Sequence, residues 1–292
     1  LMAAAIATGT SIKIDAETVL YVPQDDRPVS LQYTVDTARE AGMTILTPPQ
    51  NLISGKNYQG QADQIMAWVE QNAGRADVMV LSTDTLIYGG LVDSRKHNIP
   101  LSTLESRLKR IESLKARNKN VRIYGFGTVM RSPRASGGGT EPAYYAEYGP
   151  TIFQIAALQD KLDSGSLTQE ETQKLMSLQA SVPVEYLQDW FDRRQKNMKI
   201  NKELIDETRS GVFDYFALGH DDTSQLSQSA LESRYLSKYS KDIPVEKYGS
   251  FPGADQLGLL LMARSRTDES TEKPTFSVIY PLGGGGKTLP GY

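Results

Sequence analysis

Short apolar runs rich in β-branched residues alternate along this 292-residue chain with longer segments whose apolar positions recur every three or four residues. The first pattern predicts strands at 18–23, 43–47, 77–82, 121–127, 213–219, 245–249 and 275–281. The second predicts helices at 30–41, 61–73, 101–117, 151–163, 168–180, 184–209, 225–239 and 254–265. This alternation is typical of a mostly parallel sheet flanked by helices. We expect a Rossmann-like, three-layer α/β fold, with a (β/α) barrel as the alternative.

The segment 137–210 interrupts this rhythm. It opens with three glycines, passes a group of tyrosines (Tyr144, Tyr145 and Tyr148), and then continues as predicted helix. We interpret it as a helical insertion between two strands, with an ordinary long crossover as the alternative. Aromatic rings of this kind offer stacking surfaces for sugars, so the tyrosines are candidate ligand contacts.

Composition narrows the function classes. The formal net charge is −3, whereas a nucleic-acid-binding surface normally carries a basic excess, so we expect no nucleic-acid partner. The chain has no cysteine, which excludes disulfides, zinc–thiolate sites and thiol nucleophiles. No stretch is apolar enough to span a bilayer, and no complete phosphate-loop or dinucleotide fingerprint is present. We therefore expect neither a membrane span nor a cofactor.

The two ends of the chain differ from the rest. Residues 1–16 are mostly small and apolar and end in Ala16, which resembles the tail of a secretory signal with its cleavage site; a frayed terminus is the alternative. We expect a secreted or cell-surface protein, with a cytoplasmic location as the alternative. Residues 17–292 are expected to form the α/β domain, whose fold continues past the abrupt glycine-rich end.

Acidic residues follow three of the predicted strands. Asp25 and Asp26 follow strand 18–23, Asp84 follows strand 77–82, and Asp221 and Asp222 follow strand 213–219. Because the carboxyl ends of parallel strands open on the same side of a sheet, we expect these side chains to converge on one crevice. Carboxylates brought together are costly unless they meet a cation or a hydrogen-bonding ligand such as a sugar.

Further candidates lie beside these carboxylates. Arg27, Arg95 and Arg131 are predicted anchors for oxygens of a ligand. Tyr88 lies in the folded-in loop 84–95 and is either a sugar-stacking ring or a core residue. Asp255 lies at the start of the last predicted helix, where it caps the helix or binds ligand.

The two histidines are expected to lie in different surroundings. We expect His97 to be an exposed loop residue. His220 adjoins two carboxylates in sequence, which would favour its charged form.

Four segments, 22–29, 82–95, 219–222 and 253–256, resemble in sequence and order the bacterial domain-of-unknown-function family 4127. The resemblance implies an α/β protein with an acidic site. The family usually has Glu where this chain has Gln256. The positions that match the motifs directly are Asp25, Asp26, Arg27, Asp84, Tyr88, Arg95, Asp221, Asp222 and Asp255.

Residue chemistry favours a hydrolase that acts on a small-molecule or glycan substrate, because paired carboxyl groups cleave glycosidic bonds without a cofactor. We expect Asp221, Asp222 and Asp84 to be catalytic. The residues expected to bind substrate are Asp25, Asp26, Arg27, Tyr88, Arg95, Arg131 and Asp255. Two alternatives stay open: a metal-dependent hydrolase of ester, amide or phosphate bonds that uses the same Asp groups with His220, and a non-catalytic carbohydrate-binding protein.

Overall fold

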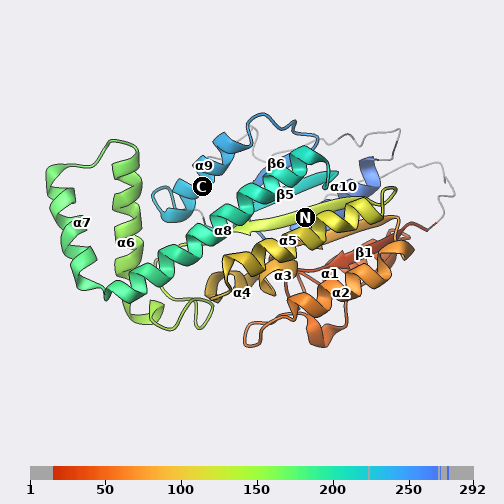
Figure 1. Cartoon of the computed structure of the whole chain (residues 1–292), viewed down its shortest axis with the longest axis horizontal. Coiled ribbons are helices and arrows are strands. Elements are labelled where there is room, and N and C mark those ends of the chain that lie inside the picture. Colours follow the sequence, from red (N-terminus) through yellow and green to blue (C-terminus); the bar gives the residue numbers. More distant parts are fainter. Residues whose placement is uncertain (1–15, 223, 269, 271–274, 276–292) are drawn as a thin grey trace, which may run out of the picture.

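The computed structural model describes residues 16–222, 224–268, 270 and 275. Within these residues, six parallel strands form one open sheet in the order β2-β1-β3-β4-β5-β6 (Figure 1). The strands are β1 (Thr18–Val22), β2 (Thr44–Leu46), β3 (Val78–Ser82), β4 (Arg122–Val129), β5 (Tyr215–His220) and β6 (Tyr248–Pro252). The three-layer α/β prediction is confirmed, and the open edges at β2 and β6 exclude a closed barrel. The predicted strand at 275–281 lies, apart from its first residue, outside the described residues.

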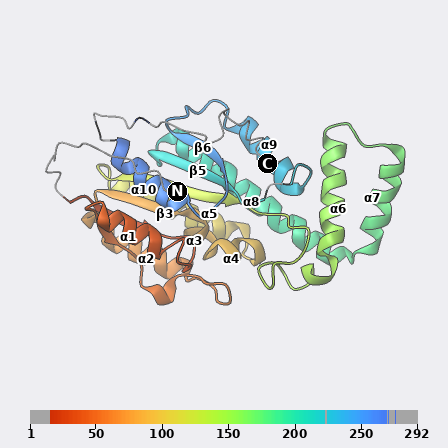
Figure 2. The ribbon, with the colours of Figure 1, turned by 180° about the vertical axis from the view of Figure 1, so that it is seen from behind.

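Helices cover both faces of the sheet (Figures 1 and 2). Side chains alternate between the faces along each strand, so Val19 and Tyr21 point to one side, and Leu20 and Val22 to the other. The first side packs against α1 (Gln32–Glu40) and α10 (Leu257–Asp268). The second packs against α2 (Ala62–Asn72), α5 (Leu101–Arg117) and the C-terminal half of α8 (Val184–Ser210). Short 3₁₀ turns at Gln50–Leu52 and Ala73–Arg75 flank α2.

Two short helices replace the loop expected at 84–95. They are α3 (Thr83–Tyr88) and α4 (Leu91–Lys96), joined by Gly89 and Gly90. The hydroxyl of Ser82 caps α3 by accepting from the amide of Thr85 at 3.3 Å, and Gly89 ends the helix with φ of 113°. Helices of fewer than two turns show no clear 3.6-residue repeat, which explains why periodicity did not reveal them.

Between β4 and β5 the chain forms α6 (Tyr145–Asp163), α7 (Gln169–Ser181) and the long α8. The α6–α7 pair stands at one end of the molecule, beside the N-terminal half of α8 (Figure 1). This part has its own apolar core, which includes Trp190. The tyrosines serve that core: Tyr145 packs against Trp190, and Tyr144 stacks on Tyr186 with ring centroids 4.7 Å apart. Tyr145 is therefore a core residue, whereas Tyr144 and Tyr148 are only partly buried and their contact with a ligand stays a prediction.

A buried ion pair joins this helical region to the sheet. Arg194 on α8 binds Glu232 on α9 (Gln228–Tyr239), with its NH2 atom 2.7 Å from the carboxylate. The same guanidinium donates to the backbone carbonyls of Met130 and Arg131, just beyond β4. This fixes the chain at the point where it leaves the sheet.

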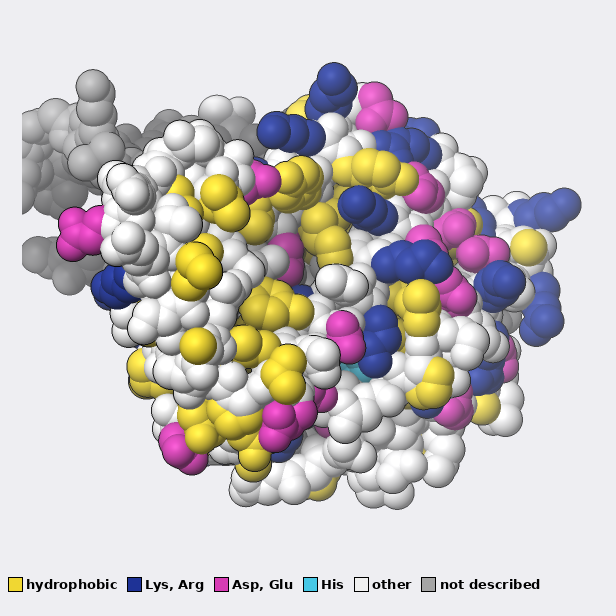
Figure 3. Space-filling model, turned by 60° about the vertical axis from the view of Figure 1, so that its left-hand side comes forward, with side chains coloured by type: hydrophobic (Ala, Val, Ile, Leu, Met, Phe, Trp, Pro, Cys, Tyr) yellow, Lys and Arg dark blue, Asp and Glu magenta, His cyan; other side chains and the backbone are white. Residues whose placement is uncertain are grey.

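The face of the molecule in Figure 3 carries side chains of both charge signs. On the face in Figure 3, Lys and Arg side chains are interspersed with Asp and Glu, and neither sign forms a continuous patch. In the described part of the chain, no helix combines the length and the apolar character needed to cross a bilayer.

The packing of α10 can be tested with neighbouring leucines. Leu261 is fully buried against the sheet, whereas Leu260 is 42% exposed on the same helix. We expect Leu261→Ala to lower the free energy of unfolding by about 2–5 kcal/mol, because it leaves a core cavity. The matched Leu260→Ala should change it by about 0.5 kcal/mol or less. Denaturant unfolding measures both, and equal losses would contradict the placement of α10.

Candidate functional site

The topology creates a crevice at the carboxyl edge of the sheet. The chain leaves β1 toward β2 on one face, through α1, and returns to β3 on the other, through α2. Ligands of doubly wound sheets bind where the strand order reverses in this way, outside the strand ends. A cavity of about 370 Å³ lies here, near the lower end of the usual range for ligand pockets. It is lined by Asp25, Arg27, Gly55, Lys56, Leu91, Val92, Arg95, Arg131, Thr140, Asp221 and Asp255.

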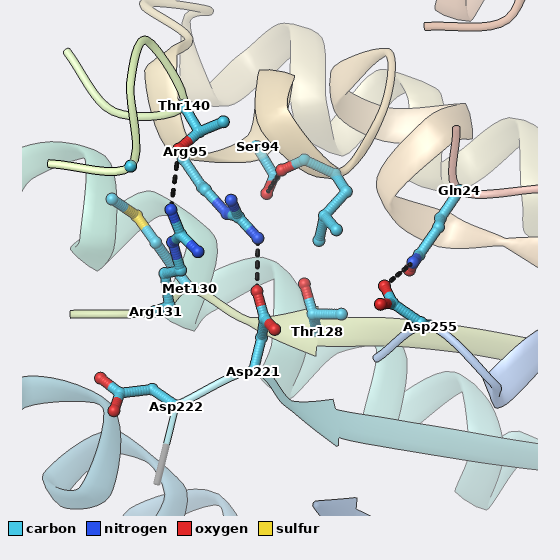
Figure 4. Close-up of polar contacts among 12 residues, drawn as sticks. Gln24, Ser94, Arg95, Thr128, Met130, Arg131, Thr140, Asp221, Asp222 and Asp255 are labelled. Carbon is cyan, nitrogen blue, oxygen red and sulfur yellow. Dashed lines mark hydrogen bonds and ion pairs between the residues drawn. The ribbon is translucent and has the colours of Figure 1, made fainter. Parts of the chain in front are cut away.

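One side of the cavity is built around Arg27. Its Nε donates to Asp25 at 2.8 Å and its NH2 group donates to Asp255 at 2.7 Å, so one guanidinium joins the segments after β1 and β6. Buried Gln24 also donates to Oδ1 of Asp255, at 3.2 Å (Figure 4). The carboxylate of Asp255 therefore accepts from side chains, and no hydrogen bond to the amides of α10 supports the capping alternative within the described residues. Gln256 is exposed and lies outside the cavity lining.

Asp26 has a different position from Asp25. Its amide donates to the carbonyl of Ser54 at 2.9 Å, and its carboxylate accepts from Tyr58, so it holds the loop at 54–60. That loop packs closely on the α3–α4 junction, where a Cβ at Gly90 would lie 1.8 Å from the hydroxyl of Ser54. Asp26 thus shapes one wall of the cavity without lining it.

Arg95 and Asp221 form the centre of the other side. Arg95 is on α4, and its side chain is only 5% exposed. Its NH2 group pairs with the carboxylate of Asp221, the first residue after β5 (Figure 4). Burial raises the pKa of Asp221, while Arg95 and Arg131 oppose this rise and Asp255 adds to it.

Asp84 lies beneath this pair in the first turn of α3. It is almost completely buried and accepts from the hydroxyl of Thr128 at 2.6 Å. Burial raises its pKa to about 7, although hydrogen bonds from Thr128 and the charge of Arg95 act in the opposite direction. Asp84 does not line the cavity, but it interacts electrostatically with both Arg95 and Asp221.

Arg131 lines the cavity from the segment that follows β4. Its guanidinium pairs with Glu141, whose side chain is 1% exposed, and donates to Thr140 at 2.7 Å. The amide of Gly137 donates to the second oxygen of Glu141 at 2.7 Å. The glycine-rich segment at 137–139 therefore closes around a buried carboxylate that holds Arg131 in place.

Asp222 is not brought into the cavity. Its carboxylate points away from Asp221 (Figure 4) and accepts from the amides of Ser132 and Ser224, at 2.9 and 3.0 Å. It therefore ties the segment after β4 to the segment after β5.

His220 also differs from expectation. Its two ring nitrogens contact the hydroxyls of Ser233 and Ser250, and burial lowers its pKa. The expectation that two neighbouring carboxylates favour its charged form is therefore wrong. The reason is that the ring is buried, while Asp221 pairs with Arg95 and Asp222 accepts from backbone amides.

Tyr88 and His97 belong to the core. Tyr88 is 7% exposed and stacks on His97 with ring centroids 4.9 Å apart, so it lies outside the cavity. His97 is 6% exposed and its Nε2 lies 2.7 Å from Asn197 on α8. The expectation of an exposed loop histidine is wrong, because α8 covers this segment. Burial lowers the pKa of His97 to about 4.

A family model described as a protein of unknown function (DUF4127) matches residues 19–292. The chain belongs to the DUF4127 family. The match covers all six strand ends, so the resemblance carried by the four motifs is confirmed. No curated protein matches the chain at a significant level.

The site of this DUF4127 chain brings together most, but not all, of the residues singled out from sequence. Asp25, Arg27, Arg95, Arg131, Asp221 and Asp255 line one cavity, whereas Asp26, Asp84, Tyr88 and Asp222 lie behind its walls. Sequence reasoning missed Lys56, Thr140 and the buried Glu141, which come from segments without a strand-end signal. In the part of the chain that the structure describes, no group of three or more His, Cys, Asp or Glu is arranged to hold a metal ion.

The raised pKa of Asp84 can be tested by measuring the free energy of unfolding as a function of pH. Because its pKa is raised from 3.8 to about 7, its contribution to folding is fully present below pH 4 and is lost as the pH rises toward 7. We expect the wild type to lose about 4 kcal/mol of unfolding free energy relative to Asp84→Asn across that window. Urea unfolding at a series of pH values measures this difference.

Asp242→Asn is a control with the opposite sign. Arg209 lowers the pKa of Asp242 to about 2, so its contribution is present above pH 4 and is lost as the pH falls. A difference between wild type and Asp84→Asn that stays constant from pH 4 to pH 8 would contradict the raised pKa of Asp84.

Proposed function

We propose that the protein is a hydrolase that cleaves a carbohydrate bound in the cavity at the carboxyl edge of the sheet. The observation that carries this proposal is a pair of carboxyl groups, Asp221 and Asp255, that line the same cavity and interact electrostatically. Glycosidic bonds are normally cleaved by two carboxyl groups, one acting as a protonated acid and the other as a carboxylate.

Asp221 suits the acid role. It is largely buried, its pKa is raised, and it lies on the cavity wall, where a leaving-group oxygen can reach it. A general acid works best when its pKa approaches the working pH. Arg95 holds the carboxyl in place and limits the rise in its pKa.

Asp255 suits the carboxylate role. Both of its hydrogen bonds, from Gln24 and Arg27, reach Oδ1. Among the described residues no hydrogen bond engages Oδ2, which leaves this oxygen able to accept from a water or a sugar hydroxyl. Asp25 keeps Arg27 in position.

We further propose that the substrate lies outside the cell or at its surface, because residues 1–16 resemble the tail of a secretory signal. The metal-dependent alternative receives less support, because both nitrogens of His220 contact serines and Asp222 binds backbone amides. A chelator arm in the assay separates the two mechanisms.

The experiment is a hydrolysis screen over glycans and acyl sugars, with products detected by chromatography, with and without chelator. We expect turnover of at least one glycan that survives chelation. Turnover abolished by the chelator would overturn the metal-free mechanism. Sugar binding without any turnover would overturn the hydrolase and support a binding protein.

Variants of the two cavity aspartates sharpen this test. Asp221→Asn and Asp255→Asn should each lower turnover by about 10²–10⁴-fold, the usual contribution of a positioned acid or base. Asp242→Asn is the control, because Asp242 pairs with Arg209 outside the cavity lining, and it should keep turnover within a few-fold of wild type. Full activity of Asp221→Asn would refute the assignment.

A further inference from the structure

The cavity contains more hydrogen-bond donors than its own acceptors use. Arg27 donates to both Asp25 and Asp255, and Arg131 donates to both Glu141 and Thr140. Arg95 is different. A guanidinium presents a planar fork of N–H donors, yet within the described residues Asp221 is the one group that accepts a hydrogen bond from Arg95.

Lys56 adds an unpaired cation on the same cavity. It lies in the loop held by Asp26 and Tyr58, and the described residues place no carboxylate within ion-pair distance of it. The other three cations that line the cavity, Arg27, Arg95 and Arg131, each pair with at least one carboxylate. Exposed Lys56 therefore adds an unpaired positive charge to the free donors of Arg95.

The proposed chemistry removes the counter-charge that Arg95 has in the resting protein. A general acid must be protonated when the substrate binds, and a protonated Asp221 carries no charge to balance Arg95. A buried guanidinium without a counter-charge is costly, since the ion has lost its hydration. The resting ion pair is stable only while Asp221 is ionised, so the reactive state needs a negative charge from elsewhere.

We propose that the substrate supplies that charge: the protein recognises a sugar that bears an anionic group, a carboxylate or a phosphate, which binds Arg95 and Lys56. This inference rests on the proposed function and names the class of its substrate. The bound oxyanion takes over the donors of Arg95, and its charge beside Asp221 favours the protonated acid. Substrate binding and protonation of the acid are thereby coupled.

The test uses probes that differ in one group. Methyl glucuronide and methyl glucoside differ by a carboxylate in place of a hydroxymethyl group, and glucose 6-phosphate provides the phosphate arm. Binding to the full chain is measured by calorimetry at constant ionic strength. We expect an anionic probe to bind about 10-fold or more tightly than methyl glucoside, the scale of one hydrogen-bonded charge pair. The stronger of the two anionic probes identifies the group.

Variants make the test specific to Arg95. Asp221→Asn removes a competing carboxylate, so it should bind the anionic probe about 10-fold more tightly than wild type while leaving methyl glucoside unchanged. Arg95→Met should abolish the preference for the anionic probe. If the unpaired Asp221 prevents that variant from folding, Arg95→Met combined with Asp221→Asn removes both charges and should also show no preference. Arg110→Met is the control, since Arg110 pairs with Glu70 on α2, away from the cavity.

Each outcome has a defined meaning. Equal binding of charged and neutral probes by wild type and by Asp221→Asn would overturn the anionic substrate and leave the hydrolase proposal intact. Absence of binding by all three probes, together with hydrolysis of a neutral glycan, would have the same meaning. A preference for the anionic probe that disappears in Arg95→Met, without hydrolysis of any anionic glycan, would support the recognition site and overturn the hydrolase.

Discussion

The ion pair between Arg95 and Asp221 holds the site of this protein together. Arg95 comes from a short helix after β3, and Asp221 comes from the end of β5, so the pair spans the sheet across β4. Because Arg95 is buried, its charge needs a partner that the fold places accurately. Asp84 lies beneath the pair and responds to its field, and Asp255 reaches the same cavity from beyond β6.

Around this centre, each cation that lines the cavity from a strand end is held by carboxylates of another segment. Arg27 connects the segment after β1 to that after β6, and Arg131 is fixed by Glu141 in the segment leading to α6. These contacts convert separate loops into one wall, because each ion pair restrains two segments at once. Such preorganisation is what a hydrolytic or binding site requires, since the charged groups need no rearrangement when a ligand arrives.

The helical region between β4 and β5 supports the site from outside. Arg194 on α8 donates to the backbone just beyond β4 and binds Glu232 on α9. Asp222 ties the same backbone to the segment after β5. The position of Arg131 on the cavity wall therefore depends on contacts made by side chains that never reach the cavity.

The alternation of strand and helix patterns was sufficient to predict the parallel three-layer sheet. The same patterns placed Asp25, Asp84 and Asp221 at strand ends. The reason is that helix and strand repeats differ, and that parallel strands present their carboxyl ends on one side. The direction in which each of two neighbouring side chains points was harder to predict. Asp26 and Asp222 adjoin cavity residues in sequence but point elsewhere, because Tyr58 holds Asp26 and the amide of Ser132 holds Asp222.

The sequence by itself determined the fold class, the family and the edge of the sheet at which the charged groups gather. Only the tertiary structure decided which of them face the cavity. It buried Tyr88 and His97 beneath α8, assigned His220 to serines, and recruited Lys56 and Glu141 from loops without a recognisable pattern. The physical reason is that burial and ion pairing depend on segments far apart in sequence. Arg95 and Asp221 are 126 positions apart, and no local pattern records their contact.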